Sequence, residues 1–277
     1  MLQISKLSKS YGKTVALDQI SCNLGKGIYG LLGPNGAGKT TFFRCLSGII
    51  EQDSGSITPV HQVGYLPQHF GFYKGMKVKE LMLLFYDLKK IPCREAHDEM
   101  LQLMEKVQLL DRMHDKVGSL SGGMLRRLGI ALALQGNPEL LLIDEPTAGL
   151  DPEQRLIFKN IIRSLRGDRT IIVSTHIVED VEALCDQIII MNKGRILTLG
   201  TEIEITQRAQ GKVYEILESQ QDTLIKPYHI IKNSQQKGQS FLRVLSDTQQ
   251  RIEPTEQTIE DAYLLYIWNE RKNAESN

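Results

Sequence analysis

The stretch Gly33-Pro34-Asn35-Gly36-Ala37-Gly38-Lys39-Thr40 lies between an apolar run at residues 27–32 and a helical pattern that begins at Thr41. Its glycine, lysine and hydroxyl spacing is that of a loop that cradles nucleotide phosphates. Small residues let successive backbone N–H groups point inward, and the positive end of the following helix adds to the anion site. Lys39 suits the β- and γ-phosphates, and Thr40 suits Mg²⁺. The stretch predicts a site for ATP or GTP, against the alternative of a chance glycine-rich turn.

Two further segments favour a nucleotide site. The apolar run at residues 140–143 predicts a strand that delivers Asp144 and Glu145 at its C-terminal end, where ligands bind in open α/β sheets. Asp144 suits Mg²⁺, and Glu145 suits an attacking water. Ser121-Gly122-Gly123 precedes a helical run at residues 125–134 and repeats the anion-site pattern, with Ser121 as N-cap. Alone, these two segments would be interpreted as a solvated turn and a plain helix start.

Taken in order, the motifs resemble those of the nucleotide-binding subunit of an ATP-binding cassette (ABC) transporter. Ala148-Gly149-Leu150-Asp151 is similar to the family's dimer-contact loop, and His176 is similar to its switch histidine for the γ-phosphate. Gln68 is similar to the glutamine that links Mg²⁺ and the attacking water to the membrane partner. Tyr11 is similar to the aromatic residue that lies against adenine. The resemblance covers roughly the first 200 residues.

The resemblance implies a complete hydrolytic site. Its catalytic residues would be Glu145, His176, Lys39 and Gln68. Its ATP-binding residues would be Tyr11, Gly33, Pro34, Asn35, Gly36, Ala37, Gly38, Lys39, Thr40, Thr41, Ser121, Gly122 and Gly123. Its Mg²⁺ ligands would be Thr40, Gln68 and Asp144. One departure is Met124, where the family usually has glutamine. Because a thioether cannot make the polar contacts of an amide, we expect altered fine geometry at the dimer interface rather than an inactive site.

The expected fold is α/β, a P-loop NTPase of the ABC type. A RecA-like mixed sheet core would carry an antiparallel β subdomain and a helical signature subdomain. Strand patterns at residues 2–7, 15–24 and 28–32 predict the antiparallel sheet beside the nucleotide site. Helical patterns at residues 80–86 and 99–110, broken at Ile91-Pro92, predict the helical part. We expect a cassette at residues 1–210, its helical subdomain at about 76–135, and a small α+β accessory domain at 211–277.

The accessory domain has its own pattern. Strand-like runs at residues 213–217, 229–232 and 241–245 precede an amphipathic helix at 258–271. Its predicted apolar face groups Ile259, Ala262, Tyr263, Tyr266 and Ile267. The expected polar face carries Glu256, Glu260, Asp261, Glu270 and Arg271. Because this face is rich in acidic residues, the pattern favours a packed C-terminal helix over a helix on a membrane surface.

Composition limits the partners. The 277 residues include 33 basic and 33 acidic ones, so the formal net charge is zero. This balance gives no electrostatic footprint for nucleic acid or an anionic membrane surface, and we expect no nucleic acid partner. No run is apolar for the length of a bilayer, and the N-terminus is no secretory signal. By resemblance, the chain would lie at the cytoplasmic side of the cell membrane, held peripherally by integral membrane permease subunits near Gln68 and Phe72.

The resemblance implies an ATPase that powers a membrane transporter, with export of a drug, peptide or other hydrophobic or amphipathic compound favoured over import. Each ATP would lie between the phosphate loop of one cassette and residues 121–123 of another, so we expect a dimer with a second copy or with a different cassette. Two alternatives are a soluble ABC-type ATPase acting on DNA or ribosomes, and a regulatory module that senses nucleotide without hydrolysing it. A single cassette, no sustained heptads and zero net charge disfavour the first. Magnesium-dependent phosphate release would exclude the second.

Overall fold

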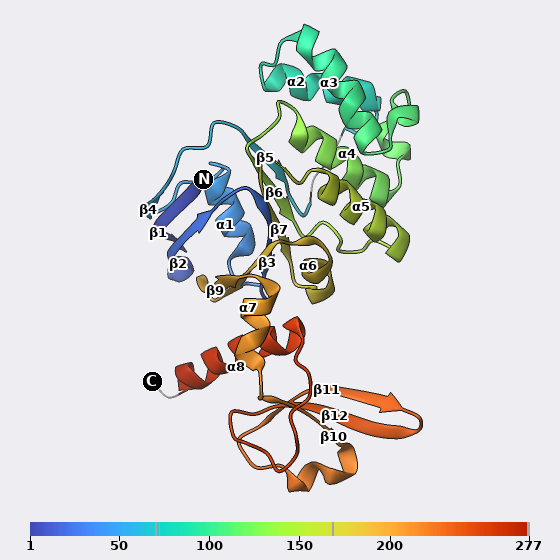
Figure 1. Ribbon diagram of the computed structural model, residues 1–277. Helices are drawn as coiled ribbons and strands as arrows, with labels where there is room; N and C mark the ends of the chain where they lie inside the picture. The colour runs from blue at the N-terminus through green and yellow to red at the C-terminus, as the bar shows by residue number, and fades with distance from the viewer. Residues whose placement is uncertain (70, 72, 168, 276–277) are drawn as a thin grey trace. The chain divides into compact units, whose positions relative to one another are not determined.

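The computed structural model describes residues 1–69, 71, 73–167 and 169–275 (Figure 1). Its largest sheet has six strands in the order β5-β6-β7-β3-β8-β9. They are β3 (Gly27–Leu32), β5 (Val63–Leu66), β6 (Leu140–Asp144), β7 (Thr170–Thr175), β8 (Gln187–Asn192) and β9 (Arg195–Gly200). The pairs from β5 across to β8 are parallel, and β6 and β7 are buried throughout, as strands covered on both faces must be. The carboxyl ends of β3, β6 and β7 therefore meet at one edge of the sheet.

A second sheet confirms the predicted antiparallel subdomain. Its strand order is β2-β1-β4, with β1 at Leu2–Tyr11, β2 at Thr14–Leu24 and β4 at Ser54–Ile57. The strand patterns at residues 2–7 and 15–24 mark β1 and β2, although β1 runs on to Tyr11, which pairs with Thr14. The third strand predicted for this sheet, at residues 28–32, was wrongly placed. It lies in β3, which pairs in parallel with β7 and β8 and is buried along almost its whole length, as a central parallel strand is. The sequence did not predict β4, because its Ser-Gly-Ser start is exposed and lacks apolar alternation.

The helical segment follows β5. Its α-helices are α2 (Val78–Leu88), α3 (Cys93–Lys106) and α4 (Gly122–Leu134), with 3₁₀ turns η1 (Leu110–Arg112) and η2 (Val117–Ser119) between α3 and α4. The break predicted at Ile91-Pro92 separates α2 from α3. The helix predicted at residues 99–110 is too long at its C-terminal end. The helix ends at Lys106 because Gln108 adopts a left-handed φ of 56°, which reverses the chain after Val107.

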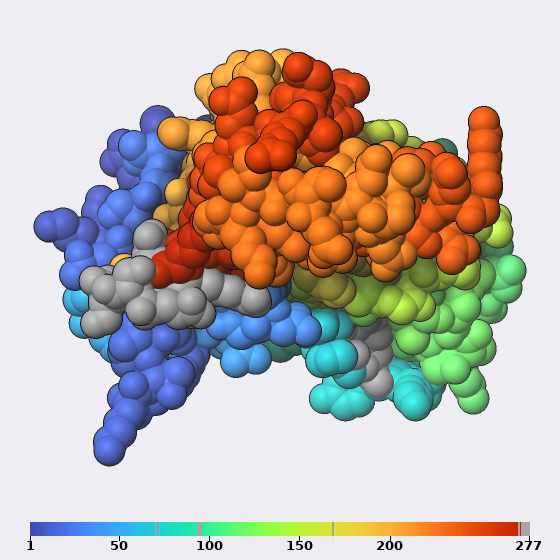
Figure 2. Space-filling model, turned by 90° about the horizontal axis from the view of Figure 1, so that it is seen from below, coloured from blue at the N-terminus to red at the C-terminus, as the bar shows by residue number. Residues whose placement is uncertain are grey.

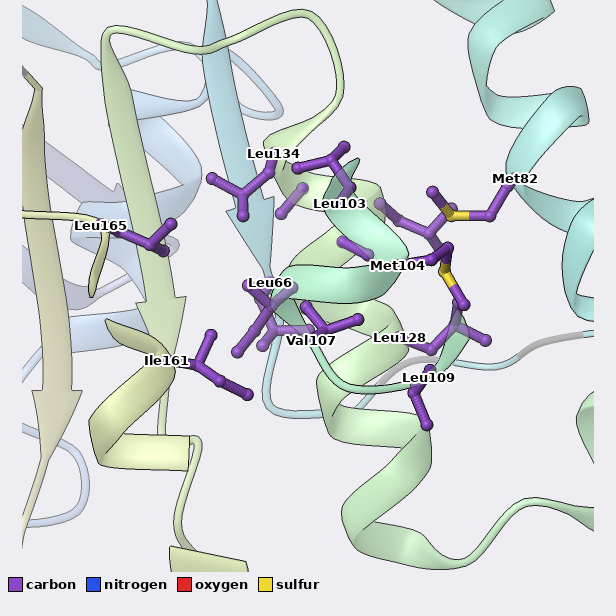
Figure 3. Close-up of a cluster of buried hydrophobic side chains, with 14 of the residues drawn as sticks. Leu66, Met82, Leu103, Met104, Val107, Leu109, Leu128, Leu134, Ile161 and Leu165 are labelled. Atoms are coloured by element: carbon purple, nitrogen blue, oxygen red, sulfur yellow. The ribbon is translucent and has the colours of Figure 1, made fainter. Parts of the chain in front are cut away.

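The largest buried apolar cluster joins these helices to the sheet (Figure 3). Leu103 of α3 and Val107 just after it lie in one cluster with Leu128 and Leu134 of α4, and Leu66 of β5 belongs to the same cluster. Full burial of such a side chain contributes about 1.5–3 kcal/mol. This packing fixes the position of α4 relative to the strands that carry the phosphate loop and the acidic pair, Asp144 and Glu145. It therefore also fixes residues 121–123 at the start of α4, which we call the signature segment.

Three more helices belong to the sheet region. They are α1 (Lys39–Leu46), α5 (Pro152–Ser164) and α6 (Val178–Leu184). Helix α1 follows β3 directly through the phosphate loop, and its Phe42 and Phe43 are fully buried. Helix α5 begins with proline at its first turn, and the Asp151 carboxylate accepts a hydrogen bond from the backbone N–H of Gln154 at 2.8 Å. This side-chain cap fixes the end of the loop that follows Glu145.

Contacts divide the chain into two compact units, Met1–Ile196 and Leu197–Asn277. Figure 2 shows the surface of the second unit in orange and red. Its elements are α7 (Glu202–Thr206), η3 (Gln207–Ala209), β10 (Val213–Leu217), η4 (Glu218–Thr223), β11 (His229–Gln236), β12 (Gln239–Leu245) and α8 (Ile259–Glu275). The three strands form an antiparallel sheet in the order β10-β12-β11. The predicted domain boundary at residues 210 and 211 stays a prediction.

The predicted polar face of α8 was wrong at two positions. Glu256 precedes the helix, which begins at Ile259, and the side chain of Arg271 lies outside the described residues. Asp261 is only 1% exposed, because Arg243 of β12 reaches it with two nitrogens, at 2.8 Å to Oδ1 and 2.7 Å to Oδ2. Ile259, Ala262 and Leu265 are also buried on this helix. Neither α8 nor any other helix in the described residues combines the length and apolar character needed to cross a bilayer.

Candidate nucleotide site

The phosphate loop connects β3 to α1 and ends in a left-handed turn. Gly38 is the N-cap of α1 with φ 104°, and a β-carbon at this position would lie 2.5 Å from the carbonyl oxygen of Ala16. Only glycine combines this backbone conformation with so close an approach. The loop therefore presents its backbone at the start of α1, where unpaired N–H groups favour an anion.

A cavity of about 440 Å³ opens over this loop. Its lining residues are Tyr11, Thr14, Val15, Ala16, Pro34, Asn35, Gly36, Ala37, Gly38, Lys39, Thr40, Thr41, Gln68 and Glu145. The predicted residues Tyr11 and Gln68 thus line the same cavity as residues 34–41, although Tyr11 comes from β1 and Gln68 follows β5. Gly33, also predicted to bind ATP, is not among these lining residues, but its carbonyl oxygen accepts a hydrogen bond from Nζ of Lys39. Phe72, expected near the partner surface, lies outside the described residues.

Lys39 is the buried cation of the cavity. Its side chain is 7% exposed, and Nζ donates hydrogen bonds to the carbonyl oxygens of Gly33 at 2.7 Å and Pro34 at 3.2 Å. Nζ also lies 3.4 Å from Oε1 of Glu145. Because a buried ammonium needs anionic or polar partners, these contacts hold Lys39 in a place where phosphate oxygens can compete for it.

Asp144 ends β6 against α1 and β7. Its Oδ2 accepts a hydrogen bond from the Thr40 hydroxyl at 2.9 Å, and its Oδ1 accepts one from the Ser174 hydroxyl. Hydroxyl, carboxylate and amide oxygens are the hard ligands that Mg²⁺ prefers, and a bound Mg²⁺ keeps several waters. The donors of Thr40 and Asp144, with Gln68 on the same cavity, therefore fit the predicted metal set.

Glu145 connects three parts of the site. Its carboxylate is 8% exposed; Oε2 lies 2.8 Å from Nδ1 of His176, and Oε1 lies near Lys39. His176 is about half exposed and follows β7. The backbone of Glu145 has a left-handed φ of 46°, which is rare for a residue with a side chain. Strain of this kind persists where surrounding contacts enforce it and is common at functional sites.

Two residues that sequence reasoning did not assign hold this acidic pair in place. Ser174 accepts a hydrogen bond at 3.0 Å from the backbone N–H of Glu145 while it donates to Asp144. Arg126 of α4 donates from a terminal nitrogen to the carbonyl oxygen of Glu145 at 3.3 Å. Burial lowers the pKa of Arg126, and the nearby Glu145 carboxylate opposes that shift. The position of Ser174, two residues before His176 at the end of a predicted strand, was a signal for its role, but no local pattern marks Arg126.

Tyr65 of β5 lies behind Asp144. Its ring meets Phe43 edge-on, with ring centroids 6.3 Å apart. Partial burial, together with the nearby Asp144 carboxylate, raises the pKa of Tyr65 to about 12, while Arg44 opposes the shift. The phenol therefore stays protonated at neutral pH and adds no negative charge beside Asp144.

The signature segment is separate from this constellation. Ser121 is exposed and caps α4, accepting a hydrogen bond from the backbone N–H of Met124 at 3.2 Å. Within the described residues, Ser121, Gly122 and Gly123 contribute nothing to the lining of the cavity over the phosphate loop. The structure thus brings together the predicted residues of the phosphate loop, Asp144, Glu145, His176, Gln68 and Tyr11, but not residues 121–123 of the same chain.

Comparisons with known proteins find relatives of this sequence. The ABC transporter family model matches residues 17–148. The linearmycin resistance ATP-binding protein LnrL of Bacillus subtilis strain 168 is 36% identical over 225 residues, covering 76% of this chain and 72% of that protein. Nod factor export ATP-binding protein I of Rhizobium sp. strain N33 is 33% identical over 267 residues, covering 90% of this chain and 87% of that protein.

Solved structures agree on the fold. The ATP-binding subunit of an ABC transporter superimposes with a TM-score of 0.67 at 26% identity, covering 75% of this chain and 92% of its own. A dimeric bacterial ABC transporter cassette has a TM-score of 0.64 at 21% identity, covering 73% of this chain and 98% of its own. The chain belongs to the family of ABC transporter ATP-binding proteins. It has the ABC cassette fold, and it is an ATPase that serves a transporter.

Proposed function

We propose that this chain hydrolyses ATP through Lys39, Glu145 and His176 and drives export through a membrane permease. The observation that carries the proposal is that one carboxylate, Glu145, has Lys39 at one oxygen and His176 at the other, beside a cavity over the phosphate loop. A positioned carboxylate next to a phosphate-binding lysine is the arrangement that activation of water for phosphoryl transfer requires.

The proposed reaction uses each group in one role. Water attacks the γ-phosphorus in line, the new P–O bond forms as the bond to the β-phosphate oxygen breaks, and ADP leaves. Glu145 accepts the proton of the water, Lys39 stabilises the charge on the phosphate oxygens, and His176 fixes the γ-phosphate. Gln68 orients the water from the side of β5, and Tyr11 stacks on the adenine.

Mg²⁺ would be held by Thr40, Gln68 and Asp144. When bound, it supplies neutralising charge to the β- and γ-phosphates. Ser174 and Tyr65 then act through Asp144, because both lie against its carboxylate and keep it oriented.

We also propose a head-to-tail dimer as the working unit. The position of Ser121 away from the cavity of its own chain supports this, since its exposed N-cap is free to meet a nucleotide held by another cassette. The second cassette is another copy of this chain or a different cassette. Sedimentation of the E145Q variant tests the dimer: Mg-ATP should convert monomer to dimer, and monomer alone at saturating Mg-ATP would contradict it.

The printed names of two relatives support export as the direction. One is a linearmycin resistance protein, and the other is a Nod factor export protein. We infer by similarity that the cargo is a drug, peptide or other hydrophobic or amphipathic compound. The chain would bind permease subunits from the cytoplasmic side of the membrane. Residues 1–210 would form the cassette, with its helical subdomain at about 76–135, and residues 211–277 would form an accessory domain.

A pull-down tests the transporter assignment. Tagged E145Q protein is recovered from its native membranes in mild detergent, with and without ATP, and its partners are identified. K39A is the matched control, because it should not hold ATP. We expect a polytopic membrane protein with E145Q. Recovery of ribosomes or DNA-bound proteins without a membrane subunit would overturn the proposal.

A further inference from the structure

Gln154, in the first turn of α5, lies against the last glycine of the signature segment. A β-carbon built on Gly123 would lie 2.3 Å from Oε1 of Gln154 and 2.8 Å from its Cδ. Real side chains do not tolerate such distances, so the carboxamide occupies the space that any other residue at position 123 would fill. Gly123 is buried beneath it. The amide of Gln154 therefore covers the backbone of the signature segment.

The conformation of Gln154 is not the one that its position in the helix favours. It stands three residues after the N-cap Asp151, where glutamine commonly returns its side chain to the backbone N–H of the cap. Its own backbone N–H does bond Asp151, at 2.8 Å. However, Oε1 is buried and has no hydrogen-bond partner in the part of the chain that the structure describes. A buried acceptor without a donor is unfavourable, so packing against Gly123 holds this amide in a place that hydrogen bonding alone would not favour.

The neighbouring signature position lacks the corresponding group. Met124 stands where the family usually has glutamine, and its side chain packs against the large apolar cluster. The signature segment thus has no amide of its own at position 124, whereas the amide of Gln154 lies one residue away over Gly123.

We propose that Gln154 is a positioning residue that supplies, from α5, the amide contact that Met124 cannot make. It holds Ser121 to Gly123 in the geometry that receives the nucleotide of the opposing cassette. Because Gln154 follows the dimer-contact loop by three residues, the same amide ties that loop to the signature segment of its own chain. This inference rests on the proposed function, since it requires a composite site between two cassettes.

The test moves the amide from one position to the other. Q154L removes the amide and keeps an apolar side chain of similar size over Gly123. M124Q/Q154L returns an amide at the signature position, and M124L/Q154L is the matched control that returns none. Each variant is compared with the wild type in kcat and KM for ATP, in melting temperature, and in the ATP concentration for half-maximal dimerisation in the E145Q background.

We expect Q154L to lower kcat/KM by about tenfold and to raise the ATP requirement for dimerisation by a similar factor, with nucleotide binding to the monomer unchanged. M124Q/Q154L should recover most of the loss, and M124L/Q154L should not. Activity of Q154L equal to that of the wild type, or equal recovery in both double variants, would overturn the role of the amide. If the wild type itself neither hydrolyses Mg-ATP nor dimerises as E145Q, the proposed function fails first and this inference with it.

Discussion

The ammonium nitrogen of Lys39 lies 3.4 Å from Oε1 of Glu145, and both side chains are less than a tenth exposed. The phosphate loop and the end of β6 are thereby joined by a buried ion pair, with His176 at the other oxygen of the same carboxylate. Buried charges need partners, so each group neutralises the other. A γ-phosphate that reaches Lys39 competes for it with Glu145, which couples nucleotide binding to release of the proposed general base.

Replacement of Lys39 should abolish tight nucleotide binding. K39A removes the cation that faces the phosphates and leaves the Glu145 carboxylate without its partner. We expect ATP affinity to fall on the order of 100-fold, measured by titration with a fluorescent ATP analogue. K39R is the control that keeps the positive charge on a side chain of different shape. Its ATP affinity should lie between those of the wild type and K39A. ATP binding to K39A within threefold of the wild type would contradict this role.

Removal of the Ser174 hydroxyl should act through Asp144. Ser174 donates to Asp144 and accepts from the backbone N–H of Glu145, so S174A loosens both acids of the site. We expect kcat to fall about tenfold and the Mg²⁺ concentration for half-maximal activity to rise. S174C, which retains a weak donor, should lose less. An unchanged Mg²⁺ requirement in S174A would mean that Ser174 does not orient Asp144.

In the C-terminal unit, Asp261 should be a main determinant of stability. It ties α8 to β12 through Arg243, and its Oδ2 also accepts hydrogen bonds from the N–H and hydroxyl of Thr258 at 2.6 Å and 2.8 Å. D261N removes the buried anion of Arg243 and leaves only the longer ion pair with Glu215 at 3.6 Å, so it should cost about 3 kcal/mol of unfolding free energy. Trp268, the only tryptophan, stacks on His229 at 5.8 Å and reports the transition by fluorescence.

The control for D261N is E260Q, because Glu260 is exposed in the same turn of α8. E260Q should shift the unfolding free energy by less than about 0.5 kcal/mol. Equal midpoints of the Trp268 transition in D261N and the wild type would show that the Arg243 contact contributes nothing net.

The ion pair between Asp261 and Arg243 predicts that the C-terminal unit loses stability at acidic pH. Burial alone would raise the pKa of Asp261, but Arg243 and the hydrogen bonds from Thr258 hold it below the ordinary value of 3.8. The unfolded chain therefore binds the proton more readily, so the contribution of Asp261 is complete only well above the unfolded-state pKa, from about pH 5 upward, and is lost as the pH falls through the lower folded-state pKa. The stability difference between wild type and D261N should shrink between pH 5 and pH 2.5. A constant difference over this range would contradict the assignment.

The sequence predicted the phosphate loop and the acidic pair because their requirements are local. Gly38 must be glycine where the backbone is left-handed and close to Ala16, and the short apolar run before Asp144 favours a buried strand, as the structure shows. The parallel sheet then brings these loop ends together. This is why residues far apart in the chain could be assigned to one site from motif order alone.

Other features depend on tertiary packing and left no local signal. Helical periodicity placed Asp261 on the polar face of α8. The pattern within one helix does not show that Arg243 of β12 contacts this carboxylate. Arg126 meets the Glu145 carbonyl only once α4 has packed on the sheet. Gln154 is an ordinary polar residue of a first helical turn until the approach of Gly123 is known.

The most direct test is phosphate release from Mg-ATP by the purified wild-type chain and by E145Q. The wild type should hydrolyse ATP, whereas E145Q should bind ATP with similar affinity and lose turnover on the order of several hundredfold, because the group that accepts the proton of the water is gone. E145Q protein that hydrolyses ATP at near the wild-type rate would contradict the role of Glu145 as the base.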